Sequence, residues 1–147
     1  MTQTVRFQKL DARAVCPHYG SADAAGADLY AILDAPLTLA AGETTLVHTG
    51  LAVEIPTGFV GLVCARSGLA TKRGLAPANK VGVIDADYRG EIMVALHNHG
   101  NVEQIIEHGE RIAQLILMPY LTATYEETES LSDTVRGSGG FGSTGAK

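Results

Sequence analysis

The stretch that decides the fold spans residues 79–92 and reads Asn-Lys-Val-Gly-Val-Ile-Asp-Ala-Asp-Tyr-Arg-Gly-Glu-Ile. The β-branched residues from Val81 to Ile84 predict one strand, and apolar residues at every second position from Ile92 to Leu96 predict another. Between them, residues 86–90 predict a hairpin loop, in which Gly90 is free to take a positive φ. The sequence therefore predicts a β-hairpin with a polar tip.

The polar tip carries two carboxylates, a phenol and a guanidinium, from Asp85, Asp87, Tyr88 and Arg89. A solvated turn would account for the same composition. Asp85 differs from the others because it directly follows the apolar run. At that edge we expect partial burial, which would hold the carboxylate in place as a base.

The composition predicts one globular domain. The chain has 147 residues, of which 46% are hydrophobic and 18% charged, with 17 Gly and no Trp. A formal net charge of −5 argues against a nucleic acid or an anionic membrane as the main partner. Cys16 and Cys64 have no zinc-like spacing, and residues 1–9 contain no apolar run of signal-peptide length. We therefore expect a cytoplasmic protein.

Short apolar segments separated by turn residues predict further strands. They cover residues 4–10, 37–39, 45–55, 59–65, 104–107, 111–120 and 122–127. One short helix is expected over residues 65–74, with Ser67 as its N-cap and Gly74 as its end. A helix that opens with Arg66, Ser67 and Gly68 is suited to bind an anion. A simple cap and a surface charge would explain Ser67 and Arg66 equally well.

Two polar residues stand out beside apolar neighbours. Asp28 precedes a short strand, where a turn residue is the ordinary explanation. Gln114 lies inside an apolar run, where an unpaired buried amide costs roughly 1–3 kcal/mol. It is therefore either a hydrogen-bonded core residue or part of a site. His97 and His99 would share a face of a strand, but no third ligand stands nearby, so we expect no metal centre there.

The composition changes near the C-terminus. From Thr128 the chain is rich in Ser, Thr, Asp and Glu, and residues 136–145 read Arg-Gly-Ser-Gly-Gly-Phe-Gly-Ser-Thr-Gly. We expect a domain over residues 1–127 and a flexible arm over residues 128–147. A plain Gly-Ser linker is the alternative, but linkers rarely carry one placed aromatic residue such as Phe141. The order of a Walker A loop is absent.

Residues 82–90 resemble the third motif of the trimeric dUTP pyrophosphatases, Gly-hydrophobic-Ile-Asp-x-Asp-Tyr-x-Gly. Residues 25–31, 109–114 and 136–145 are similar to the first, fourth and fifth motifs of that family. Residues 65–68 are similar to the second motif, with Ala65 in place of its usual proline. Five motifs in family order cover the chain from about residue 25 to 145.

The resemblance implies a role for each motif. It makes Asp85 the base that activates water, and Tyr88 the ring that packs on deoxyribose and excludes a 2′-hydroxyl. It implies that Asp28 acts on Mg²⁺ through water, while the substrate phosphates mainly hold the ion. The substrate-binding residues that it implies are Arg66, Ser67, Gly68, Asn79, Gly82, Val83, Ile84, Tyr88, Met93, Gln114, Arg136, Phe141, Gly142, Ser143 and Thr144.

The implied fold is all-β, a jelly-roll-like barrel with one short helix and a Gly-rich C-terminal arm. The implied assembly is a homotrimer with three shared sites. One subunit supplies Asp28, Arg66, Ser67 and Gln114, a second the Asp85 loop, and a third the arm. The implied reaction is Mg²⁺-assisted hydrolysis of dUTP to dUMP and pyrophosphate, which keeps uracil out of DNA and supplies dUMP for thymidylate synthesis.

Two other functions are weighed against this one. A deoxycytidine triphosphate deaminase resembles this family in fold. Its activity would need a glutamate in the third motif, and such a deaminase has no long Gly-rich arm. A non-catalytic nucleotide sensor or structural trimer would lack the base or the arm. The chain has Asp85 and the arm, so both alternatives are disfavoured.

Overall fold

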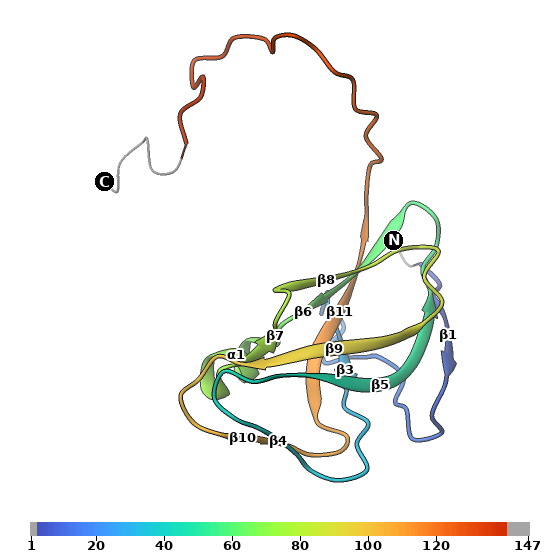
Figure 1. Cartoon of the computed structure of the whole chain (residues 1–147). Helices are drawn as coiled ribbons and strands as arrows, with labels where there is room; N and C mark the ends of the chain where they lie inside the picture. The colour runs from blue at the N-terminus through green and yellow to red at the C-terminus, as the bar shows by residue number, and fades with distance from the viewer. Residues whose placement is uncertain (1–2, 141–147) are drawn as a thin grey trace.

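The computed structural model describes residues 3–140, which form eleven strands and one short helix (Figure 1). The strands are β1 (Arg6–Lys9), β2 (His18–Tyr19), β3 (Ala27–Tyr30), β4 (Leu37–Leu39), β5 (Thr44–Glu54), β6 (Phe59–Cys64), β7 (Leu75–Pro77), β8 (Val81–Ile84), β9 (Glu91–Asn98), β10 (Gln104–Ile106) and β11 (Arg111–Pro119). The helix is α1 (Ser67–Arg73). The prediction of an all-β chain with one short helix is confirmed. Within residues 3–140 no helix is long and apolar enough to cross a membrane.

The strands form two large sheets and one small one. One sheet has the order β1-β5-β9-β7, the other has the order β2-β3-β11-β6-β8, and β10 pairs with β4. A core of buried side chains fills the space between the sheets, as shown by Leu51 and Val94 from the first and Leu29 and Val63 from the second. Along β9 every second residue from Ile92 is buried, so the predicted two-residue alternation is confirmed.

The predicted hairpin between residues 81–84 and 91–98 is wrong. β8 pairs with β6, whereas β9 pairs with β5 and β7 in the other sheet. The segment 85–90 therefore crosses from one sheet to the other. It begins with a turn in which the Tyr88 N–H donates to the Asp85 carbonyl at 3.2 Å. Gly90 is required for space and not for a positive φ, because a Cβ there would lie 2.4 Å from the Tyr88 hydroxyl.

The start of α1 also differs from the prediction. Arg66 occupies the N-cap position without a side-chain hydrogen bond to the helix, and Ser67 is the first helical residue. The predicted Ser67 cap is therefore wrong by one position, a common error at helix ends. The predicted C-terminus is confirmed, since Gly74 ends the helix in the left-handed conformation, with φ 66°.

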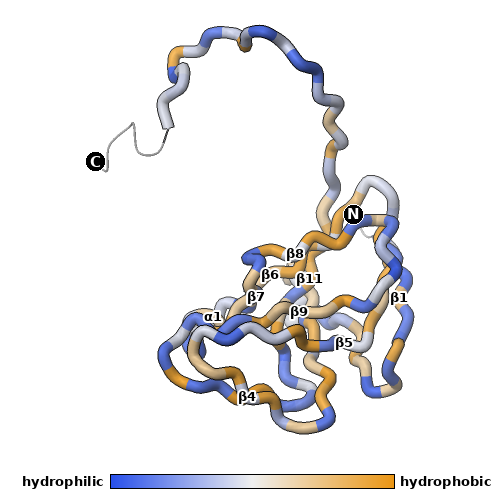
Figure 2. Tube along the Cα trace, viewed as in Figure 1, coloured by the Kyte–Doolittle hydropathy of each residue, from blue (hydrophilic) through white to orange (hydrophobic). Residues whose placement is uncertain are grey.

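The chain leaves the folded body after β11. The strand predicted over residues 122–127 is absent, and residues 121–140 run away from the sheets without regular secondary structure (Figure 1). Figure 2 shows this segment as largely polar, interrupted by single apolar residues. Leu121 and Tyr125 are 98% and 94% exposed. Within residues 3–140, no strand pairs with residues 122–127.

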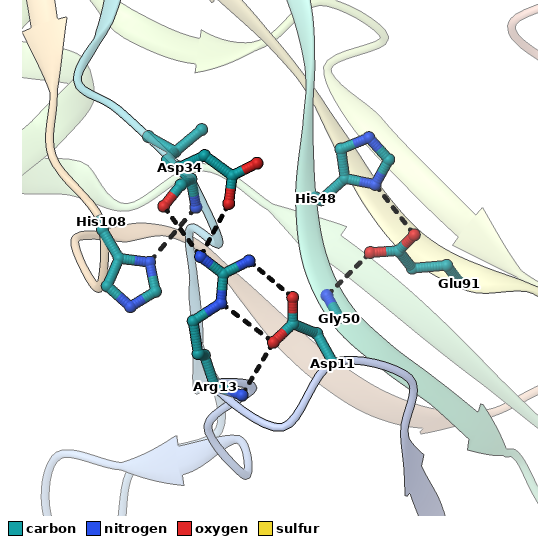
Figure 3. A network of polar contacts seen from close by, with 8 residues as sticks. Asp11, Arg13, Asp34, His48, Gly50, Glu91 and His108 are labelled. Atoms are coloured by element: carbon teal, nitrogen blue, oxygen red, sulfur yellow. Dashed lines mark hydrogen bonds and ion pairs between the residues drawn. The ribbon is translucent and has the colours of Figure 1, made fainter.

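A polar network joins β5 to the end of the crossing segment 85–90 (Figure 3). The register of β5 against β9 shifts between His48 and Ala52, which marks a bulge. The Glu91 carboxylate accepts a hydrogen bond from the Gly50 N–H at 2.8 Å and lies 2.9 Å from His48 Nδ1. These contacts fix the first residue of β9 to the neighbouring strand.

Beside that network, Arg13 bridges two carboxylates (Figure 3). Its guanidinium donates to Asp11 at 2.7 Å and to Asp34 at 2.9 Å. Hydrogen bonds from the Arg13 side chain and backbone lower the pKa of Asp11 to about 2. The cluster therefore ties the N-terminal segment to the loop after β3 while all three residues stay in contact with water.

Candidate active site

A surface pocket of about 250 Å³ lies where β3, β11 and the first turn of α1 meet. Its lining residues come from three separate stretches of the sequence and are Gly20, Ala24, Gly26, Asp28, Arg66, Ser67, Gly68, Arg111 and Gln114. The structure thus brings together the predicted site residues of the first, second and fourth motifs.

Asp28 is the buried acid of the pocket. It lies on β3, and its carboxylate accepts hydrogen bonds from Arg66 Nε at 2.7 Å and from Arg111 Nη1 at 3.1 Å. Arg66 comes from the N-cap of α1 and Arg111 from the first position of β11. With two guanidinium groups around one carboxylate, the formal charge of the three side chains is +1, which favours an anionic ligand.

Gln114 faces the pocket and not the core. Its side-chain amide donates to the Ala65 carbonyl at 2.8 Å, which fixes the side chain against the segment before α1. The amide oxygen lies close to Gly26, where an added Cβ would be 2.2 Å from it. A side chain at position 26 would therefore displace the Gln114 amide from its place in the pocket.

Ser67 and Gly68 are exposed at the rim of the pocket, in the first turn of α1. The first backbone hydrogen bond of the helix runs from the Ala70 N–H to the Arg66 carbonyl, so the N–H groups before Ala70 have no partner within the helix. These donors and the Arg66 guanidinium can bind phosphate oxygens.

A second group of predicted residues lies on β8 and the segment 85–90. β8 is the edge strand of its sheet, and among the described residues only β6 pairs with it. Its other edge therefore presents unpaired backbone donors and acceptors, which are free to pair with a ligand or another chain. Asn79 and Val83 are exposed, and Gly82 and Ile84 are half-buried.

Asp85 is exposed in the isolated chain, so the expected partial burial is wrong. The reason is that β8 and β9 diverge into different sheets, which leaves the intervening segment on the surface. Tyr88 is held more firmly, because its hydroxyl donates to the Glu91 carbonyl at 2.9 Å. Met93, from β9, is also exposed.

The third group belongs to the C-terminal segment. Arg136 Nε donates to the Gly139 carbonyl at 2.8 Å, in a stretch that lies away from the folded body (Figure 1). Phe141, Gly142, Ser143 and Thr144 lie outside the described residues. Neither Arg136 nor any residue of β8 lines the pocket around Asp28. One chain thus carries three separate groups of predicted site residues.

No group of three or more potential metal ligands from His, Cys, Asp and Glu occurs in the described part of the chain, residues 3–140. The rings of His97 and His99 have centroids 4.2 Å apart, and His97 Nδ1 lies 2.7 Å from the Thr44 hydroxyl. The two oxygens of Asp28 each accept from an arginine. Asp28 is thus the one carboxylate among the described residues that line the pocket.

Arg111 is a residue of the pocket that the sequence did not predict. On a regular strand, residues 111 and 114 point to opposite faces. A register shift between Arg111 and Ala113 changes this alternation, and Ile112 and Ala113 are both buried. Arg111 and Gln114 then lie on the same side. The only sequence signal is the pair of consecutive apolar residues after an arginine, which does not by itself identify a bulge.

Together, the fold and the pocket define a class of protein. It is an all-β domain of two packed sheets with a cationic surface pocket, an exposed sheet edge beside a carboxylate, and a long C-terminal extension. Such a pocket is suited to bind a phosphate chain, and the sheet edge is suited to bind a base.

Comparison with known proteins identifies the family within this class. A family model described as dUTPase matches residues 12–145. The deoxyuridine 5′-triphosphate nucleotidohydrolase of Aeromonas hydrophila is 46% identical over 150 residues, covering 99% of both chains. That of Rickettsia felis is 50% identical over 129 residues, covering 88% of this chain and 87% of the relative. The chain belongs to the dUTPase family.

Solved structures agree with this assignment. The dUTPase of Staphylococcus bacteriophage 80alpha with dUpNHpp has a TM-score of 0.89 at 30% identity, covering 98% of this chain and 99% of that one. The predicted jelly-roll-like fold is thereby confirmed.

Proposed function

We propose that the pocket around Asp28, the Asp85 segment and the C-terminal arm form one composite active site. As a dUTPase, the chain hydrolyses dUTP to dUMP and pyrophosphate, a reaction that keeps uracil out of DNA and supplies dUMP for thymidylate synthesis. The observation that carries the proposal is the cationic pocket, in which Arg66, Gln114 and the first turn of α1 converge on one space.

The pocket binds the phosphate chain. Arg66, Ser67 and Gly68 offer a guanidinium, a hydroxyl and free N–H groups, and Gln114 contacts the phosphate next to the scissile bond. These groups offset the charge of the triphosphate, which otherwise repels a nucleophile, and they hold the chain for in-line displacement.

Asp85 is the general base in this proposal. It takes a proton from the water that attacks the α-phosphorus, and pyrophosphate leaves. Its exposure in the isolated chain gives water access to the carboxylate. The backbone of Gly82, Val83 and Ile84 binds uracil along the free edge of β8, with Asn79 and Met93 beside it.

Mg²⁺ fits this site as a substrate-bound ion. Asp28, whose oxygens accept from Arg66 and Arg111, would help to hold the ion through water, and the phosphates of dUTP would mainly hold it. When bound, the ion neutralises developing phosphate charge.

The proposed partner is a second and a third copy of the chain. Among the described residues, neither Arg136 nor any residue of β8 lines the pocket around Asp28, so a homotrimer with shared sites would bring the groups together. Sedimentation is expected to show a trimer, because exposed apolar residues such as Leu46, Val83 and Tyr125 become buried on association. A fully active monomer would contradict shared sites. The two free thiols, Cys16 and Cys64, suit the cytoplasm.

The function is tested by pyrophosphate release with Mg²⁺ from dUTP, dTTP, dCTP and UTP measured side by side. A strong preference for dUTP is expected, because a backbone edge and a tight pocket distinguish uracil from thymine and cytosine. Equal rates on all four nucleotides would contradict the proposal.

Tyr88→Ala is expected to weaken the discrimination between dUTP and UTP. The ring excludes a 2′-hydroxyl by its volume, so the loss appears in the ratio of the two kcat/KM values. Tyr88→Phe is the matched control, since it keeps the ring and removes only the hydrogen bond to the Glu91 carbonyl. An unchanged ratio in Tyr88→Ala would remove Tyr88 from the sugar site.

A further inference from the structure

Asp28 is enclosed by two arginines that differ in exposure. The side chains of Asp28 and Arg66 are 12% and 25% exposed, whereas that of Arg111 is 51% exposed. Each guanidinium contacts a different carboxylate oxygen, Oδ1 for Arg66 and Oδ2 for Arg111. The carboxylate therefore has a fixed orientation, set by one cation from α1 and one from β11.

Arg111 also contacts Arg66 directly. The backbone carbonyl of Arg111 accepts a hydrogen bond from Arg66 Nη1 at 3.3 Å, while Arg66 Nε is bound to Asp28. A guanidinium has five N–H donors. These two contacts fix the plane of the Arg66 guanidinium and leave its other N–H groups for a ligand in the pocket.

The charge of the pocket depends on Arg111. Arg66 and Asp28 alone would neutralise each other, and the carboxylate would face the phosphates with one oxygen uncovered. Like charges at close range repel, and the repulsion is stronger in a partly buried site than in water. Arg111 both covers that oxygen and makes the three-residue cluster cationic.

We propose that Arg111 is a positioning residue for the phosphate chain of the substrate. It acts through Asp28, because it screens the charge of the carboxylate and fixes its orientation. The carboxylate in turn holds the Arg66 guanidinium toward the ligand. This inference rests on the proposed function of the pocket and adds to it a residue that acts on the phosphates indirectly.

The test measures two quantities, the KM for dUTP with Mg²⁺, determined together with kcat, and the dissociation constant of inorganic tripolyphosphate by calorimetry. Arg111→Gln is expected to raise the KM for dUTP and the dissociation constant for tripolyphosphate about 10-fold each, because the Asp28 carboxylate then loses its charge-assisted contact and repels the phosphates. Arg111→Lys is expected to recover part of both losses, since it keeps the charge. The melting temperature serves as a check on folding.

Arg6→Gln is the matched control. Arg6 forms a 3.4 Å pair with Glu54 across β1 and β5, and its side chain is 82% exposed. Its substitution removes the same charge from the protein without touching the pocket. Both quantities are expected to stay within about 2-fold of wild type, because isolated surface pairs contribute little.

A double-variant cycle decides whether Arg111 acts through Asp28. In an Asp28→Asn background the added Arg111→Gln change is expected to have less than about a 2-fold effect, because the negative charge that Arg111 screens is gone. A full 10-fold effect in that background would mean that Arg111 binds phosphate by itself, and would overturn the proposal. So would an Arg111→Gln variant with both quantities unchanged.

Failure of the proposed function would give a different experimental result from failure of the proposal for Arg111. Wild-type protein that binds tripolyphosphate but does not hydrolyse dUTP would contradict the proposed reaction, while the cycle on tripolyphosphate affinity would still test Arg111.

Discussion

Asp85→Asn is expected to lower kcat for dUTP by about 10²- to 10⁴-fold while the affinity for nucleotide stays near that of wild type. The amide occupies the same volume as the carboxylate but cannot accept a proton from water. Because Asp85 lies on an exposed segment and makes no contact that the core depends on, the melting temperature should not change. The measurement is single-turnover hydrolysis, together with binding of a non-hydrolysable analogue.

Asp87→Asn provides the matched control. Asp87 lies two residues further along the same crossing segment, is exposed, and has the same charge. If charge alone near the site mattered, both variants would lose activity equally. An Asp85→Asn variant within a few-fold of wild type would show that Asp85 is not the base.

Deletion of residues 135–147 is expected to leave the melting temperature and the trimer nearly unchanged and to lower kcat by about 10²-fold or more. Val135 is fully exposed and residues 136–138 are also exposed, so the described start of this segment buries little apolar surface in its own chain. Its proposed value lies in covering bound nucleotide, with Phe141 on the base and Arg136, Gly142, Ser143 and Thr144 on the phosphates. Closure of this kind excludes water and completes the site.

Limited proteolysis gives an independent measurement of the same arm. In the intact protein, cleavage within residues 128–147 is expected to slow when a non-hydrolysable dUTP analogue and Mg²⁺ are added. Full activity of the truncated protein would identify the arm as a linker.

Local patterns in the sequence predicted local structure well. The alternation of Ile92, Val94 and Leu96 predicted β9, and Gly74 predicted the end of α1. Strand partners were harder to predict, because a turn after Asp85 is compatible with a hairpin and with a crossing between sheets. Which one forms depends on the edges that β5 and β6 offer, and these lie more than twenty residues earlier in the chain.

In the candidate site, too, features that depend on local sequence were predicted and features that depend on distant contacts were not. Asp28, Arg66 and Gln114 were predicted from their motifs and lie together in the pocket. Arg111 was missed because its position depends on a bulge in β11, which depends on packing more than on the residue types. The prediction that Asp85 is partly buried was wrong, because the single chain leaves that segment exposed. The apolar residues that precede Asp85 in the sequence do not show whether another chain covers it.

The length of the extension after β11 also sets the effective concentration of the arm at the site that we propose it covers. An extended chain over residues 121–140 reaches about 70 Å, whereas a body of this size has a radius of gyration of about 13 Å. Within the proposed trimer the arm would be tethered, so its effective concentration at a neighbouring site would be of millimolar order. Its closure is then independent of the protein concentration, in contrast to trimer assembly. A free peptide with the sequence of residues 128–147 would need a similar millimolar concentration to restore turnover to the truncated protein.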